Sequence, residues 1–323
     1  MPFLAGFDAR WQDAADYLAA LTHDLSEAHR LDRAEEYLAP DVLSHDGCGA
    51  RRGPVPVAAD LAARRAAFPD LVFLHDETLW TSTAHNAFVA AQRFQAQGRH
   101  DGPGLYGLPT GAALSCAVMS ERWCASGRVQ EQWQVWDEAA VVRQLGLSEE
   151  TAARYRLKAM RATGTAGDAP PPEKPRLYSG TGDDDAWGHT LGDMVHRAMG
   201  GELSVIERHY DAAAELNHPG GVTGLGRREA AAFWIALRAA FPSAEFRVEH
   251  TLGTEEPLSS PRAAIRWSLR GRHDGHGALG APTGAPVEIL GMTQAEFGPG
   301  GLRREWTLFD SIGARMQIMA ATG

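Results

Sequence analysis

The chain has 323 residues, of which 44% are hydrophobic, and its formal net charge is -10. This length is sufficient for two domains, each with a core of its own. The acidic balance argues against a nucleic-acid partner, because binding a polyanion depends on a basic stripe that neutralises phosphates.

The N-terminal part of the chain predicts helices. Residues 13–25 carry apolar side chains at helical spacing. A second helix is expected over residues 31–38 and should end at Pro40, and a third over residues 57–68 should end at Pro69.

Strands are expected after Pro69. Alternating and β-branched segments are separated by turn residues at Gly98, Gly107 and Ser126. The predicted strands cover residues 71–79, 87–97, 112–123 and 129–136.

Proline, glycine and alanine dominate residues 162–175. Because this segment has too little apolar content for a core, we expect an exposed and fairly stiff connector. The predicted domains are 1–160 and 186–323, with a linker over 161–185. In the second domain we expect a helix over 230–241 and strands over 245–252, 263–271, 287–297 and 302–309.

The two halves repeat each other at a constant interval. Corresponding residues lie 173 positions apart: Phe68 and Phe241 before proline, the Gly-Arg-His-Asp-Gly strings beginning at Gly98 and Gly271, the Pro-Thr-Gly strings at Pro109 and Pro282, and the pairs His45/His218, Trp133/Trp306 and Asp137/Asp310. A constant offset across so many landmarks indicates a tandem duplication. We expect the two copies to pack as a pseudo-dimer within one chain, with a further homodimer as an open alternative.

Helices followed by an antiparallel meander predict an α+β domain in which a curved sheet wraps over helices. Such a sheet leaves a conical, mostly apolar cavity at its open end, which is a natural site for a small molecule.

The strings that recur in the two halves resemble the pattern of one known family. The strings Gly-Arg-His-Asp-Gly and Gly-Leu-Pro-Thr-Gly are followed by Glu131, Trp133, Asp137 and an Arg-Gln-Leu-Gly string ending at Gly146. This order resembles the SnoaL-like polyketide cyclases of the nuclear transport factor 2-like superfamily. The resemblance implies two cone-shaped α+β domains, and it is less informative about chemistry because this fold hosts several reactions.

The resemblance also shows a departure. The aspartate that acts as acid and base in the aldol cyclases of this family falls on Gln134 and Thr307, and a histidine that helps bind substrate falls on Ser120 and Thr293. None of these side chains exchanges a proton near neutral pH, so the aldol-cyclase mechanism is not predicted for this chain.

Histidines and acidic residues are the candidate catalytic groups. Histidine has a reference pKa near neutrality, and a carboxylate beside a buried indole is expected to have a raised pKa. We predict catalytic roles for His45, His100 and Glu131 in the first copy and for His218, His273 and Glu305 in the second. A cap of a turn is an equally open interpretation of His100 and His273.

Further residues are candidates for substrate binding. Glu131, Trp133 and Asp137 share one face of the last predicted strand, because residues two apart point the same way, but alternation alone does not identify the inner face. The candidates for substrate binding are Arg99, Trp133, Gln134, Asp137, Arg272, Trp306 and Asp310. The two arginines would bind a substrate carboxylate, although a solvated strand end is an open alternative.

These observations predict a cofactor-independent enzyme that acts on a small carbonyl or ester-type metabolite by acid/base chemistry. No zinc-type spacing or phosphate loop occurs, so no metal and no cofactor are expected. The N-terminus lacks a signal peptide and no apolar run could span a bilayer, so we expect no membrane partner and a cytoplasmic location. The three cysteines, Cys48, Cys116 and Cys124, are expected to be reduced and buried.

Two alternatives stay open. A non-catalytic binding or scaffold module is favoured by the loss of the cyclase aspartate in both copies. Water attack, as in epoxide hydrolases of this fold, would need an Asp-Arg-Asp cluster, and the sequence does not assemble one.

Overall fold

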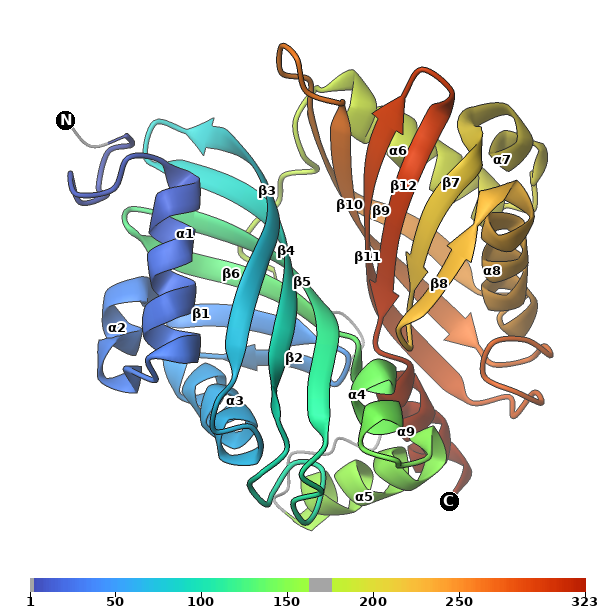
Figure 1. Cartoon of the computed structure of the whole chain (residues 1–323), viewed down its shortest axis with the longest axis horizontal. Coiled ribbons are helices and arrows are strands. Elements are labelled where there is room, and N and C mark those ends of the chain that lie inside the picture. The colour runs from blue at the N-terminus through green and yellow to red at the C-terminus, as the bar shows by residue number, and fades with distance from the viewer. Residues whose placement is uncertain (1–2, 163–175) are drawn as a thin grey trace. The chain divides into compact units, whose positions relative to one another are not determined.

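A computed structural model describes residues 3–162 and 176–323 of the chain (Figure 1). The described residues form two compact units, and each unit contains one six-stranded sheet. The predicted fold class, two α+β domains with curved and mainly antiparallel sheets over helices, is confirmed.

The first unit follows the predicted order, with helices before the long strands. Its helices are α1 (Ala14–Thr22), η1 (His23–Glu27), η2 (Leu31–Arg33), α2 (Ala34–Tyr37) and α3 (Pro54–Ala67). Its strands are β1 (Leu38–Asp46), β2 (Gly49–Arg52), β3 (Val72–Ala84), β4 (Ala87–Arg99), β5 (Ala113–Ala125) and β6 (Arg128–Trp136), in the spatial order β2-β1-β6-β5-β4-β3. Every neighbouring pair is antiparallel except β1 and β6, which are parallel.

The second unit repeats this arrangement. Its helices are α6 (Ala186–Met199), α7 (Ser204–His209), α8 (Gly226–Ala240) and the C-terminal α9 (Ser311–Thr322). Its strands are β7 (Tyr210–His218), β8 (Val222–Leu225), β9 (Glu245–Thr254), β10 (Arg262–Arg272), β11 (Pro286–Gly298) and β12 (Gly301–Phe309), in the spatial order β8-β7-β12-β11-β10-β9.

Local chemistry sets the limits of these elements. The carboxylate of Asp13 caps α1 by accepting the amide of Asp16 at 2.8 Å, and Asp185 caps α6 in the same way. The hairpin between β5 and β6 turns at Ser126 and Gly127, which both have positive φ, as a tight two-residue hairpin turn requires.

Two segments near the expected linker belong to a different unit than their order in the sequence suggests. Helices α4 (Glu138–Gln144) and α5 (Glu149–Ala162) follow β6, and α5 packs on α9 and belongs to the second unit. Leu177 and Tyr178 belong to the first unit, although they follow α5 in the sequence.

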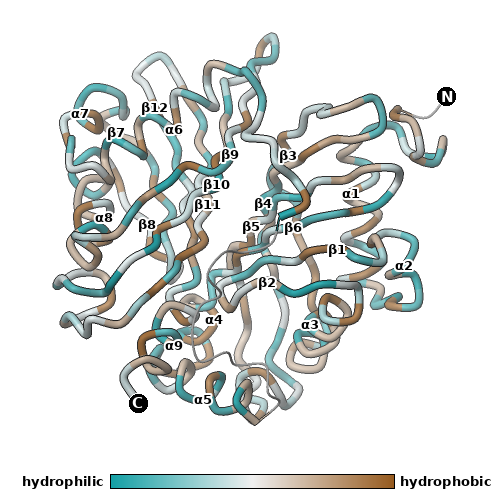
Figure 2. The backbone as a smooth tube through the Cα atoms, turned by 180° about the vertical axis from the view of Figure 1, so that it is seen from behind, coloured by the Kyte–Doolittle hydropathy of each residue, from teal (hydrophilic) through white to brown (hydrophobic). Residues whose placement is uncertain are grey.

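The core of each unit lies between the helices and the concave face of its sheet. In the first unit Phe88, Ala90, Cys124 and Val129 pack with Tyr17 of α1. Because side chains alternate along a strand, these residues identify the inner face of β4, β5 and β6. Figure 2 shows that hydrophilic residues also lie on the strands of this sheet.

Candidate functional site

The inner face of β6 carries Gln132, Gln134 and Trp136. Gln132 lies opposite Arg122, and Gln134 lies opposite Ser120, on the inner face of β5. A register shift between Val129 and Glu131 turns Glu131 and Trp133 to the opposite, convex face of the sheet. The positions at which the family resemblance expects a substrate-binding histidine and an acid/base aspartate, Ser120 and Gln134, therefore face each other on the concave side.

His45 and Glu131 form a pair on the convex face of the first sheet. The distance from His45 Nε2 to Glu131 Oε1 is 2.7 Å, and the His45 ring stacks on Trp133. The other carboxylate oxygen of Glu131 accepts the backbone amides of Leu177 and Tyr178 at 2.8 and 2.6 Å. Both members of the pair are buried, so the pair is enclosed by its own unit.

The second copy places its histidine on the other face. Trp306 lies opposite Asn217, whereas Trp133 lies opposite His45, so β7 is displaced by one residue against β12 relative to the first copy. Because a shift of one residue reverses the face of every side chain, His218 lies on the concave side. The constant interval in the sequence therefore does not give His45 and His218 the same environment.

His218 meets Glu305 on this concave face. The distance from His218 Nε2 to Glu305 Oε1 is 3.2 Å. Glu305 also accepts the Tyr210 hydroxyl and, at 2.8 Å, the Thr307 hydroxyl. Burial alone would raise the pKa of Glu305, but its hydrogen bonds with His218, Tyr210 and Thr307 outweigh this effect, and its pKa is lowered.

A second layer supports this carboxylate. Thr307 and Thr293 occupy the positions at which the family resemblance expects the acid/base aspartate and the substrate-binding histidine, and their hydroxyl oxygens are 3.0 Å apart. The indole of Trp267 donates to Thr293 at 3.1 Å. The Glu305 carboxylate thus contacts the position that an acid/base aspartate holds in the aldol cyclases.

His218 connects the buried carboxylate with the surface. Its side chain is 7% exposed, while Glu305 is completely buried, and its ring lies flat on Phe233 of α8 at 3.8 Å. The ionised Glu305 can only accept a hydrogen bond, so His218 Nε2 donates the proton. Nδ1 is then the basic nitrogen, and it has no hydrogen-bond partner among the described residues.

His100 and His273 fasten turns rather than joining either pair. Each ring nitrogen Nδ1 lies 3.1 Å from the hydroxyl of the threonine in the following Pro-Thr-Gly string, Thr110 or Thr283. Both side chains are fully buried, and burial lowers the pKa of His100 and of His273. Both histidines are therefore neutral at neutral pH. Of the two interpretations, a catalytic base or a cap of a turn, their contacts with the turn threonines favour the cap.

The predicted binding residues lie at several separate places. Arg99 and Arg272 donate to the carbonyl oxygens of Gly111 and Gly284 and brace the same turns. Asp137 accepts the backbone amides of Gly220 and Gly221, and Asp310 caps α9. Trp133 stacks on His45, and Trp306 lies opposite Asn217.

Arg122 is a charged residue of the concave face that we did not predict. Its Nη1 donates to Gln92 and, at 2.9 Å, to Ser120, and only 6% of its surface is exposed. The signal was present in the sequence, because Ser120 and Arg122 lie two residues apart on the strand predicted over residues 112–123. Identifying the face required the structure.

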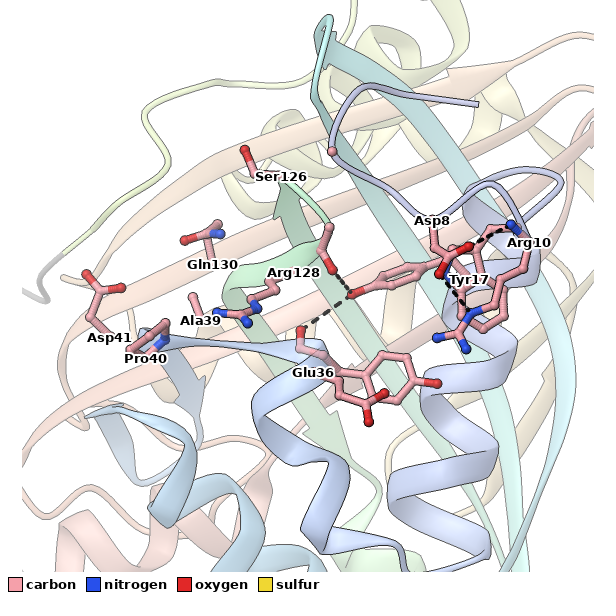
Figure 3. A pocket seen from close by; sticks show the side chains of 14 residues that line it. Asp8, Arg10, Tyr17, Glu36, Ala39, Pro40, Asp41, Ser126, Arg128 and Gln130 are labelled. Atoms are coloured by element: carbon pink, nitrogen blue, oxygen red, sulfur yellow. Dashed lines mark hydrogen bonds and ion pairs between the residues drawn. The ribbon is translucent and has the colours of Figure 1, made fainter. Parts of the chain in front are cut away.

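A pocket of about 550 Å³ opens near the N-terminal end of α1 (Figure 3). Tyr17, Tyr37 and Arg128 contribute to its wall, and none of the predicted catalytic residues lines it. The Tyr17 hydroxyl is hydrogen-bonded to the carbonyl oxygens of Gly127 and Tyr37, and both of these residues also line the pocket.

The described residues contain no cluster of three or more His, Cys, Asp or Glu side chains suited to a metal ion. All three cysteines are free; Cys116 and Cys124 are buried as predicted, whereas the prediction was wrong for Cys48, which is exposed in the turn between β1 and β2. Among the described helices, none has the length and apolar character to span a membrane.

Both copies match the model of the same protein family. The model of the SnoaL-like polyketide cyclase matches residues 16–145 and 194–318, which is more than half of the chain. The chain belongs to the SnoaL-like polyketide cyclase family. A search of curated proteins finds no match.

Solved structures of the SnoaL-like type resemble about one half of this chain each. IdmH from Streptomyces antibioticus is 22% identical, covers 41% of this chain and 98% of its own, and has a TM-score of 0.36. TsrD from Streptomyces laurentii is 20% identical over 42% of this chain and 98% of its own, with a TM-score of 0.35. A SnoaL-like polyketide cyclase from Agrobacterium tumefaciens is 19% identical over 42% and 98%, with a TM-score of 0.32.

Proposed function

We propose that the protein is a cofactor-independent acid/base enzyme that acts on a small carbonyl or ester-type metabolite, with His218 and Glu305 as its catalytic pair. The observation that carries this proposal is the 3.2 Å contact between His218 Nε2 and a completely buried carboxylate. A carboxylate that orients a histidine fixes its tautomer and stabilises the imidazolium form.

The proposed reaction begins with removal of a proton beside the substrate carbonyl. His218 Nδ1 takes this proton, and the ionised Glu305 stabilises the resulting positive charge on the ring. The enolate then regains the proton from His218 Nδ1 at another carbon, which is an isomerisation. Alternatively, the enolate carbon attacks a second carbonyl group, which closes a ring, and the alkoxide formed from that carbonyl takes the proton back from His218 Nδ1. Membership of the SnoaL-like family supports a reaction of this general type.

In this proposal the remaining predicted residues have structural roles. His45 and Glu131 stabilise the convex face of the first sheet, and His100 and His273 hold turns. This division is supported by the complete burial of these side chains and by the partners described above.

The test is exchange of carbon-bound protons in D₂O, followed by proton NMR on a panel of β-keto esters and 1,3-diketones. The wild-type chain should accelerate exchange for at least one compound, and His218→Gln should lower the rate by about 10²–10⁴-fold, the usual contribution of a positioned base. His45→Gln is the matched control and should retain the wild-type rate. Equal rates for His218→Gln and the wild type would exclude His218 as the base.

A non-catalytic binding module is the second candidate. It is favoured by the saturation of Glu305, whose oxygens already accept three hydrogen bonds without a substrate. Failure of the wild-type chain to exceed the buffer rate with every compound of the panel would support this candidate over the enzyme.

A further inference from the structure

The first domain contains a buried positive charge that no described carboxylate neutralises. The hydrogen-bond partners of Arg122 are the neutral side chains of Gln92 and Ser120. Burial lowers the pKa of Arg122, which shows how unfavourable the site is for an isolated cation. Buried charges in proteins are normally paired, so this position calls for an anion.

The guanidinium group is oriented with one edge free. Nη1 is held by Gln92 and Ser120, and Gln92 is itself fixed by a 3.2 Å hydrogen bond to Thr78. Nε is buried without a hydrogen-bond partner, and Nη2 makes no hydrogen bond to any described residue. Nε and Nη2 together form the edge with which arginine binds both oxygens of a carboxylate.

Several side chains around this face remain partly exposed. Leu61 and Arg64 of α3 and Gln134 of β6 are partly accessible to solvent. On the same face, the guanidinium of Arg64 lies 3.8 Å from the centroid of the buried Trp136 ring and covers it.

The second copy has no arginine at the position of Arg122 and therefore provides an internal comparison. Ala295 and Ile265 stand at the positions that correspond to Arg122 and Gln92, and both are buried. Trp234 and Leu237, which correspond to Leu61 and Arg64, are completely buried. At these four positions the second concave face thus carries buried apolar side chains, where the first carries polar or partly exposed ones.

We propose that the concave face of the first domain binds a small organic carboxylate, whose two oxygen atoms accept hydrogen bonds from Nε and Nη2 of Arg122. This site is separate from the His218–Glu305 pair, so its occupation does not depend on the proposed reaction.

The test uses benzoate as the probe and its neutral analogue benzamide as the control, with isothermal titration calorimetry on the full chain. The wild type should bind benzoate at least about tenfold more tightly than benzamide, and Arg122→Met should weaken benzoate binding by at least about tenfold. Arg128→Met, a substitution of an exposed arginine on β6, should keep the wild-type affinity. His218→Gln should keep it as well, which separates this site from the proposed catalytic pair.

Stability gives an independent readout. Without ligand, Arg122→Met should unfold at a higher temperature than the wild type, because an unpaired buried charge is removed. Benzoate should raise the melting temperature of the wild type and not that of the variant. If Arg122→Met does not fold, Gln92→Leu replaces it and should weaken benzoate binding several-fold. Equal benzoate affinity in the wild type and the arginine variant, or no benzoate binding by the wild type, would overturn the proposal.

Discussion

His100 and His273 show how a titratable residue is used for structure at the scale of a single side chain. Each occupies the same position in its copy, each is fully buried, and each contacts a threonine ten residues later. Only the neutral imidazole suits this environment, because the second nitrogen, Nε2, is buried without a hydrogen-bond partner.

This burial predicts a loss of stability in mild acid. The folded-state pKa of both histidines is lowered below the reference value of about 6.5, so the unfolded chain binds more protons below that pH. Their contribution is complete above about pH 6.5 and is lost as the pH falls towards the folded-state value. The double variant His100→Asn/His273→Asn should show a weaker fall of melting temperature between about pH 7 and pH 5 than the wild type. Equal slopes in calorimetry would contradict this assignment.

Residue types were predictable from the sequence, but their faces were not. The pair His218–Glu305 joins two of the predicted catalytic residues, and so does His45–Glu131. Alternation gives each strand two equivalent faces, and the register shift before Glu131 has no sequence signal that separates it from ordinary alternation. The choice between Glu131 and its neighbour Gln132 as an inner residue therefore needed the core contacts of the sheet.

At the scale of elements, one pair of facing residues differs in size between the two copies. In the second copy Trp267 lies opposite Gly291. The corresponding residues of the first copy, Phe94 and Val118, lie opposite each other in the same way, with a smaller ring and a larger partner. A Cβ atom at Gly291 would collide with the indole ring of Trp267. The larger ring is thus compatible with the fold only because its neighbour has no side chain.

This compensation predicts a coupled pair of substitutions. Gly291→Val should lower the free energy of unfolding by about 1–3 kcal/mol through overpacking. Adding Trp267→Phe should recover part of that loss, since the pair then matches the first copy. Urea unfolding of both single variants and the double variant measures the coupling. Strictly additive effects would show that the two side chains do not compete for space.

Tyr178 fastens the segment after the linker to the first domain. Its ring stacks on Trp123 at 5.4 Å, and its amide binds Glu131. Tyr178→Ala should lower the free energy of unfolding by about 3 kcal/mol, as expected for removal of a buried aromatic ring. Leu177→Ala is the matched control, because its amide also binds Glu131 while its side chain is exposed, and it should change stability by less than about 0.5 kcal/mol. Similar losses in both variants would argue against the ring contact.

The third helix of each copy and the four strands after it were predicted closely, whereas the strands before that helix, β1, β2, β7 and β8, were missed. The second predicted helix ends at Tyr37, and Leu38 already begins β1, so Pro40 lies inside a strand rather than after a helix. Proline is tolerated there because the pairing of β1 with β6 is interrupted between Leu38 and Leu43. A proline after a helical pattern indicates an end of the helix, but it does not reveal that a strand follows at once.

At the scale of the whole molecule, chain order and compact units do not coincide. Helix α5 follows the first sheet in sequence but packs on α9, where Glu149 binds Arg315 at 3.0 Å. Ala152, Ala153 and Leu157 of α5 are buried. The second copy therefore depends on a helix that a cut at the repeat boundary would remove.

This arrangement predicts a difference between two fragments. Residues 149–323 should be more stable than residues 180–323 by about 2 kcal/mol, which corresponds to the burial of one large apolar side chain. Thermal unfolding of the purified fragments measures the difference. Identical melting temperatures would mean that α5 adds nothing to the second unit.

The one-residue displacement of β7 has a consequence for protein engineering. If residues of β1 were grafted onto β7 at the interval of 173, side chains from the concave face of β1 would lie on the convex face of β7. Side chains from the convex face of β1 would lie on the concave face of β7. A chimaera of the two copies needs an interval of 172 for this strand and 173 for its partner β12. A one-residue displacement of a strand thus gives the histidines of two duplicated copies different environments, although both copies keep the histidine.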